Sequence, residues 1–197
     1  MSGGQQERSH GRPSHTPERA RKPLDLREIL QLEAALMEVF RTIRHLRTHT
    51  AAAGHIKFPS LPSVFSESIA IAATPLLFGP GWRARYGGRT ADVLVENTDT
   101  GHVLRVEVKA TGRHAFQELK GKDLRADFLL WIRFGTRLES GSGPIEVALL
   151  ESPGKYVTRQ CRLDVRRLEA IPGLQEAQRL FRFESLKSML TVAASRG

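Results

Sequence analysis

The amino-acid sequence predicts an α/β fold built around a central mixed β-sheet. Three observations support this prediction: helical and strand-like segments alternate along the chain, two strand-like runs flank the turn NTDTG, and DFLLWIRF holds a continuous apolar run. Apolar runs of this kind form strands that are buried on both faces of a sheet. We therefore expect an α/β sandwich.

The chain of 197 residues is long enough for one domain with a core of ordinary size. Residues 1–23 offer almost nothing to bury and are rich in arginine, so we expect a disordered basic tail. The remainder divides into an N-terminal helix at 24–57, a core at 58–152 and a C-terminal helical extension of the same domain at 153–197.

A capping box is expected to begin the N-terminal helix, because Asp25 is followed three residues later by Glu28. Apolar residues then form a stripe at helical spacing: Ile29, Leu32, Leu36, Val39, Ile43 and Leu46. We expect this stripe to pack on its own domain, and dimerisation through it is the alternative.

The core is predicted to start with a helix at 63–77 that buries Phe65, Ile69, Ala73 and Leu76. Strands are expected at WRARY, ADVLVEN and HVLRVEVKA, and the last two form a hairpin. A short helix, HAFQELKGKDLR, precedes the strands DFLLWIRF and IEVALLES. CRLDVRRLEA and LQEAQRLFRFESLKSML both read as helices.

The charge of the chain favours a polyanionic partner, since 30 Lys and Arg against 21 Asp and Glu give +9 and a pI near 10.4. The single cysteine, Cys161, excludes an internal disulfide and a multi-cysteine zinc site. The chain shows neither a signal-peptide core nor an apolar run of roughly 20 residues, so we expect a cytoplasmic protein with no membrane partner. It also lacks a Walker-type pattern, which predicts no nucleotide cofactor.

Charged side chains interrupt the strand-like run VLRVEVKATG at 103–112. The two-residue period of a strand places Glu107 and Lys109 on one face, and the hairpin brings Asp92 beside Glu107. Two carboxylates can hold Mg²⁺, and a nearby lysine can orient a water and stabilise a phosphorane. The alternative is a solvated strand face with a weak ion pair.

The chain carries Asp92 and, after fourteen further residues, Glu107-Val108-Lys109 on an apolar strand. This pattern is similar to the motif of the PD-(D/E)xK nuclease superfamily. The resemblance implies a restriction-endonuclease-like α/β/α core over roughly 58–152. It also implies that Asp92, Glu107 and the carbonyl of Val108 bind the metal, that Lys109 acts on the water, and that Glu67 is an auxiliary ligand. Ala91 stands where the family often has proline.

A second ExK, Glu118-Leu119-Lys120, is a control within the same chain. In the helix predicted there, Glu118 and Lys120 do not face each other, so a bare ExK is weak support for a site. Further residues are expected to contact nucleic acid: Arg83, Arg85, Arg89, Gln117 and Lys120.

The function that this resemblance implies is a restriction-type endonuclease that hydrolyses DNA with Mg²⁺, for which Mn²⁺ can substitute. It implies 5′-phosphate ends and, because two strands are cut with one site per chain, a homodimer. The alternatives are a repair or junction-resolving nuclease of the same fold, or a nucleic-acid-binding protein without catalytic activity.

Overall fold

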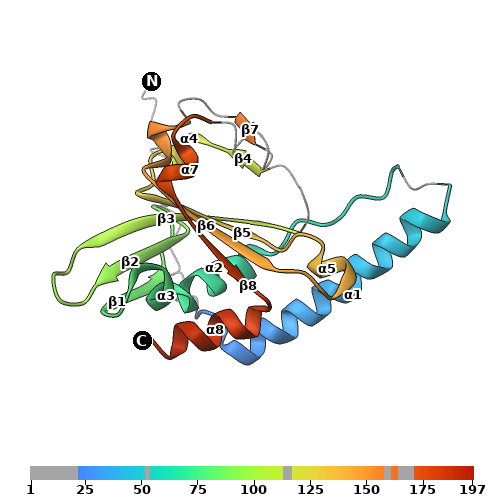
Figure 1. Cartoon of the computed structure of the whole chain (residues 1–197), viewed down its shortest axis with the longest axis horizontal. Helices are drawn as coiled ribbons and strands as arrows, with labels where there is room; N and C mark the ends of the chain where they lie inside the picture. The colour runs from blue at the N-terminus through green and yellow to red at the C-terminus, as the bar shows by residue number, and fades with distance from the viewer. Residues whose placement is uncertain (1–21, 52–53, 113–116, 158–160, 164–170) are drawn as a thin grey trace, which may run out of the picture.

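The computed structural model describes residues 22–51, 54–112, 117–157, 161–163 and 171–197, which form a mixed α/β fold around a six-stranded sheet (Figure 1). The strands lie in the order β1-β2-β3-β5-β6-β8. β3 and β5 run parallel, and the other neighbouring strands run antiparallel. The predicted mixed sheet is thereby confirmed.

The strands β1 (Trp82–Tyr86), β2 (Val93–Asn97) and β3 (Val103–Thr111) form where the sequence predicts them. β2 and β3 make the expected hairpin, in which Val93 pairs with Val106 and Glu96 with Val103. Asn97 closes the turn, because its side-chain oxygen accepts hydrogen bonds from the N–H groups of Asp99 and Thr100.

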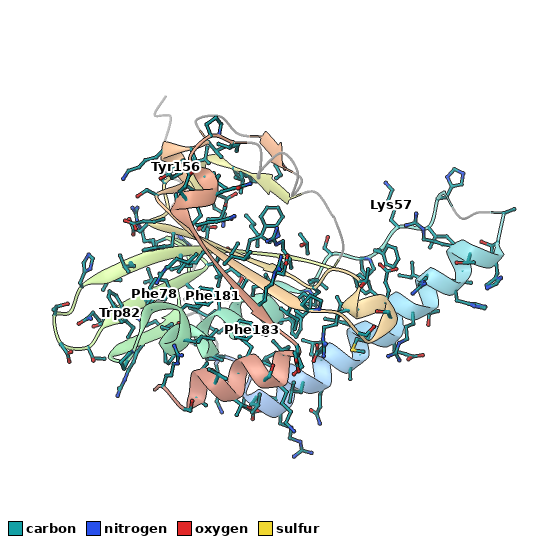
Figure 2. All side chains as sticks on the ribbon, viewed as in Figure 1. Lys57, Phe78, Trp82, Tyr156, Phe181 and Phe183 are labelled. Carbon is teal, nitrogen blue, oxygen red and sulfur yellow. The ribbon has the colours of Figure 1, made fainter. Side chains whose placement is uncertain are left out.

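The middle of the sheet is formed by β5 (Phe128–Arg133), which pairs with β3 and with β6 (Ile145–Glu151). All of β5 except its first residue is buried, as its apolar sequence predicts. The edge strand β8 (Gln178–Phe183) follows β6, and the half-buried rings of Phe181 and Phe183 pack on the main core (Figure 2).

One face of the sheet is covered by α1 (Leu26–His49), α2 (Ser63–Ala72), α3 (Thr74–Phe78) and α8 (Leu186–Ala194) (Figure 1). The predicted capping box is present at Asp25 and Glu28. The single helix expected at 63–77 is two helices, because Pro75 interrupts the hydrogen-bond pattern near Ala73. The four residues predicted to be buried there are buried.

The buried face of α1 differs from the predicted stripe. Ile29, Leu36 and Phe40 are buried, whereas Val39 and Leu46 are 45% and 40% exposed. A heptad repeat drifts around a straight helix of 3.6 residues per turn, so it cannot follow one face over this length.

The opposite face of the sheet carries a smaller layer that we call the cap (Figure 1). It consists of β4 (Gln117–Leu119), α4 (Gly121–Leu124), the 3₁₀ turn η1 (Pro153–Lys155), β7 (Cys161–Leu163) and α7 (Leu174–Ala177). Its apolar residues pack on Leu129 and Trp131 of β5, and the labelled Tyr156 belongs to this layer (Figure 2).

Three helix predictions are wrong in part. Residues 117–119 and 161–163 pair as antiparallel strands, and among the described residues of HAFQELKGKDLR only those of α4 are helical. In the predicted C-terminal helical extension, the helix expected at LQEAQRLFRFESLKSML is instead α7, the sheet strand β8 and α8. Each strand is stabilised by a distant partner, which local helical spacing cannot reveal. Residues 113–116 and 164–170 lie outside the described residues.

No helix in the described part of the chain is both long enough and apolar enough to cross a bilayer.

The packing of α1 can be tested with adjacent substitutions. Phe40→Ala should lower the free energy of unfolding by about 3–5 kcal/mol, because it opens a cavity against Gly112, whose added Cβ would lie 2.5 Å from the Phe40 ring. Val39→Ala should change it by no more than about 0.5 kcal/mol, because Val39 is exposed. Denaturant titration measures both; a larger loss for Val39→Ala would show that the predicted stripe is the buried one.

Candidate functional site

The candidate site lies where β2 separates from β3. The paired register of the hairpin ends at Val93 and Val106, but β3 continues to Thr111. Beyond this point the carboxylate of Asp92 takes the position of a strand partner: its Oδ2 accepts a hydrogen bond of 2.9 Å from the N–H of Val108. The side chain of Asp92 is therefore held at the edge of β3.

The alternation of β3 decides which side chains face the cap. Val106 and Val108 belong to the core under α2. Glu107 and Lys109 point to the other face, where they pair in register with Leu129 and Trp131 of β5. Glu107 is only 1% exposed. A carboxylate at this depth needs a positive partner.

Lys122 of α4 provides that positive charge. Its Nζ lies 2.7 Å from Oε2 of Glu107 and 3.0 Å from Oδ1 of Asp92. The two carboxylates that the sequence analysis placed together thus converge on a single cation. The contact with Glu107 is ionic, because Oε2 accepts no hydrogen bond of good geometry.

Asp123, the neighbour of Lys122, pairs with the lysine of the motif. Its Oδ1 lies 3.0 Å from Nζ of Lys109, and its Oδ2 accepts a hydrogen bond of 2.6 Å from the N–H of Lys120. Asp123 is fully buried. Consecutive residues of α4 therefore present a cation to the acids and an anion to the lysine of the hairpin.

These contacts shift the ionisation of the buried acids. Burial raises the pKa of Glu107 to about 7, the charge of Asp92 adds to this rise, and Lys122 opposes it. Burial alone would raise the pKa of Asp123, but hydrogen bonds from Lys120 and Lys109 outweigh it, so the pKa lies below its ordinary value. Burial would likewise lower the pKa of Lys122, yet Glu107 and Asp92 raise it.

The other predicted metal ligands are the carbonyl of Val108 and the side chain of Glu67. The N–H of Val108 points to Asp92, and its carbonyl points to the same edge because both groups of a strand residue do so. Glu67 is half-buried on α2, which packs on the opposite face of the sheet from Glu107. Its role as an auxiliary ligand stays a prediction.

The predicted nucleic-acid contacts are mostly exposed. Arg83 and Arg85 alternate with the core residues of β1 and share the face of Asp92 and Glu107, because Arg85 pairs with Leu94 and Leu94 with Arg105. Arg89 is exposed in the following turn, and Lys120 is exposed at the start of α4. The side chain of Gln117 lies outside the described part of the structure.

Sequence reasoning missed Lys122 and Asp123. The predicted helix at HAFQELKGKDLR gave no reason to direct either residue towards the hairpin, and only the strand pairing of the cap turns α4 inward. A signal was present, since a base and an acid stand next to each other, six and five residues before the buried strand β5. In the second ExK, Glu118 and Lys120 are both exposed and do not share the buried setting of the first.

The oxygen donors of this site suit a hard divalent cation. Two carboxylates and one strand carbonyl lie at one edge, and Mg²⁺ commonly binds one or two carboxylates and keeps several waters. Among the described residues, however, no group of three or more His, Cys, Asp or Glu side chains is arranged to hold a metal ion. The third nearby acid, Asp123, is paired with Lys109.

The chain matches no model of a known protein family, and comparison with curated proteins and with solved structures gives no match either.

The raised pKa of Glu107 predicts a specific dependence of stability on pH. Between its ordinary pKa of 4.5 and about 7, the unfolded chain loses the proton that the folded protein keeps, so the free energy of unfolding falls as the pH rises. Without divalent metal, the wild type should lose about 1–3 kcal/mol relative to Glu107→Gln across this window. Urea titrations of both proteins measure the difference.

Glu96→Gln is the control for loss of a carboxylate, because Glu96 is exposed on β2 of the same sheet. Parallel stability curves for the wild type and Glu107→Gln would show that Glu107 does not retain its proton in the folded protein.

Proposed function

We propose that this protein is a metal-dependent nuclease that hydrolyses phosphodiester bonds in DNA and has the restriction-endonuclease-like fold of the PD-(D/E)xK superfamily. One observation carries the proposal: Asp92 and Glu107 converge on one positive charge at the end of a hairpin, and Lys109 stands on the same strand face. A solvated strand face would leave these side chains in water, but Glu107 is buried.

In this proposal Asp92, Glu107 and the carbonyl of Val108 hold Mg²⁺ or Mn²⁺, and Glu67 assists. The bound cation would lower the pKa of its water and neutralise charge on the phosphate. The ion pair with Asp123 holds the ammonium of Lys109 in place on the same strand face as Glu107. Lys109 then orients the attacking water and stabilises negative charge at phosphorus. The cap limits the access of bulk water to Glu107.

The substrate is proposed from charge and from the resemblance to the nuclease superfamily. A net charge of +9 favours a polyanion, and the exposed Arg83 and Arg85 of β1 would form a basic surface on the same face of the sheet as the site. Duplex DNA, 5′-phosphate ends and a homodimer that cuts both strands complete the restriction-type proposal.

A second candidate is a nucleic-acid-binding protein without catalytic activity. The ion pairs favour it, because each of the three acids of the site is paired with Lys122 or Lys109 without any metal. The two candidates differ in whether the protein cleaves DNA when a divalent cation is supplied.

Cleavage of supercoiled plasmid with Mg²⁺ or Mn²⁺ tests the catalytic proposal. Glu107→Gln and Lys109→Met should each lower the rate at least about 100-fold, because each removes a group that acts on the metal or on the reacting phosphate. Glu118→Gln is the matched control in the second ExK and should cleave at the wild-type rate, because Glu118 is exposed on β4.

Wild-type rates in Glu107→Gln and Lys109→Met would contradict the site assignment. DNA binding by the wild type without cleavage of any plasmid, linear or branched substrate would favour the non-catalytic candidate.

The basic surface can be tested by DNA binding in the presence of EDTA. The double variant Arg83→Ala/Arg85→Ala should bind more weakly, and the slope of log K against log salt should fall by about 1–2, because up to two phosphate contacts are lost. Arg179→Ala/Arg182→Ala removes two exposed arginines from the far edge strand β8 and is the charge-matched control. Equal slopes for the two double variants would exclude a specific role for β1.

A further inference from the structure

The ammonium of Lys122 occupies the position between two carboxylates that a bound cation would take. Its Nζ is within 3.0 Å of Oδ1 of Asp92 and within 2.7 Å of Oε2 of Glu107. The two carboxylates come from different strands and otherwise repel each other. One positive charge placed between them reduces this repulsion.

The contact with Lys122 compensates the charge of Glu107, but it does not give its buried oxygen a well-directed hydrogen bond. Oε2 of Glu107 is buried and accepts no hydrogen bond of good geometry, although it faces Nζ at 2.7 Å. An ammonium has directed N–H donors, whereas a metal ion binds oxygen lone pairs from a wider range of directions. A metal ion could therefore take the place of the ammonium at this oxygen.

Lys122 can leave this position without a rearrangement of the cap. α4 is anchored by Asp123, the fully buried neighbour of Lys122. It is also anchored by close packing on Gly154, where an added Cβ would meet the carbonyl oxygen of Leu124 at 2.5 Å. The side chain of Lys122 is by contrast 53% exposed and has four flexible carbons. Rotation of this side chain into solvent would free both carboxylates.

We propose that Lys122 is a built-in competitor for the divalent cation, so that metal binds to Asp92 and Glu107 only when the ammonium is displaced. The inference rests on the proposed function, because it takes these two acids as the metal ligands. Lys122 thereby sets the metal affinity of the site, and Asp123, which stays in place, keeps Lys109 oriented when Lys122 leaves.

The competition has a measurable size. When only a fraction of molecules has a free site, the apparent Kd equals the intrinsic Kd divided by that fraction. An ammonium that occupies the site about nine-tenths of the time would weaken metal binding about tenfold. Removal of its charge should recover that factor.

Mn²⁺ binding to the full chain without DNA tests the proposal, with calorimetry as the readout at constant pH and salt. Lys122→Met keeps most of the side-chain volume and removes the charge, so it should lower the Kd for Mn²⁺ by about tenfold or more. Lys187→Met removes the same charge from an exposed position on α8 and should leave the Kd of the wild type unchanged.

The outcomes separate this inference from the proposed function. An equal or higher Kd for Lys122→Met than for the wild type would overturn the competition and leave the metal site intact. Absence of saturable Mn²⁺ binding in both proteins would overturn the metal site itself, and with it the proposed nuclease activity.

A measurement on the wild type covers the case in which Lys122→Met does not fold. Reductive methylation modifies lysine amines, and an amine held between two carboxylates reacts more slowly than a solvated one. Saturating Mg²⁺ should raise the methylation rate of Lys122, measured by mass spectrometry, and leave that of Lys187 unchanged. An unchanged or reduced rate at Lys122 would show that the metal does not displace it.

Discussion

The buried carboxylate of Glu107 is the constraint on which the candidate site depends. It lies between the sheet and the cap, beside a second carboxylate, in a place where an isolated negative charge would be strongly unfavourable. Either a proton or a cation must compensate for it. In this structure Lys122 supplies the positive charge. The pKa of Glu107 is nevertheless raised, because burial still favours the neutral form of its carboxyl group. The site is therefore chemically incomplete without a positive partner.

The two different pairings of β3 produce this arrangement. Antiparallel pairing with β2 brings Asp92 beside β3, and parallel pairing with β5 extends β3 beyond the point where β2 turns away. At the unpaired edge left between them a side chain replaces the strand partner, because Asp92 accepts a hydrogen bond from the N–H of Val108. The parallel crossover from β3 to β5 passes through β4 and α4, which places Lys122 and Asp123 directly over that edge.

The cap links stability to function in the proposed nuclease. Its apolar residues pack on Leu129 and Trp131, the register neighbours of Glu107 and Lys109. The packing that excludes water from the acids therefore also positions α4, which carries Lys122 and Asp123. A low-dielectric surrounding strengthens each of these ion pairs and makes the loss of any one partner more damaging.

The sequence by itself determined the mixed α/β class, the capping box of α1, the hairpin and the shared face of Glu107 and Lys109. These features follow from local rules: the two-residue side-chain period of a strand, the residue types that favour turns, and the three-residue spacing of the two acids in a capping box. Only the tertiary structure decided that residues 117–119, 161–163 and 178–183 are strands, that α1 packs through Phe40, and that Lys122 and Asp123 enter the site. Those choices depend on partners far away in the chain, whose pairing and burial outweigh local helical preference.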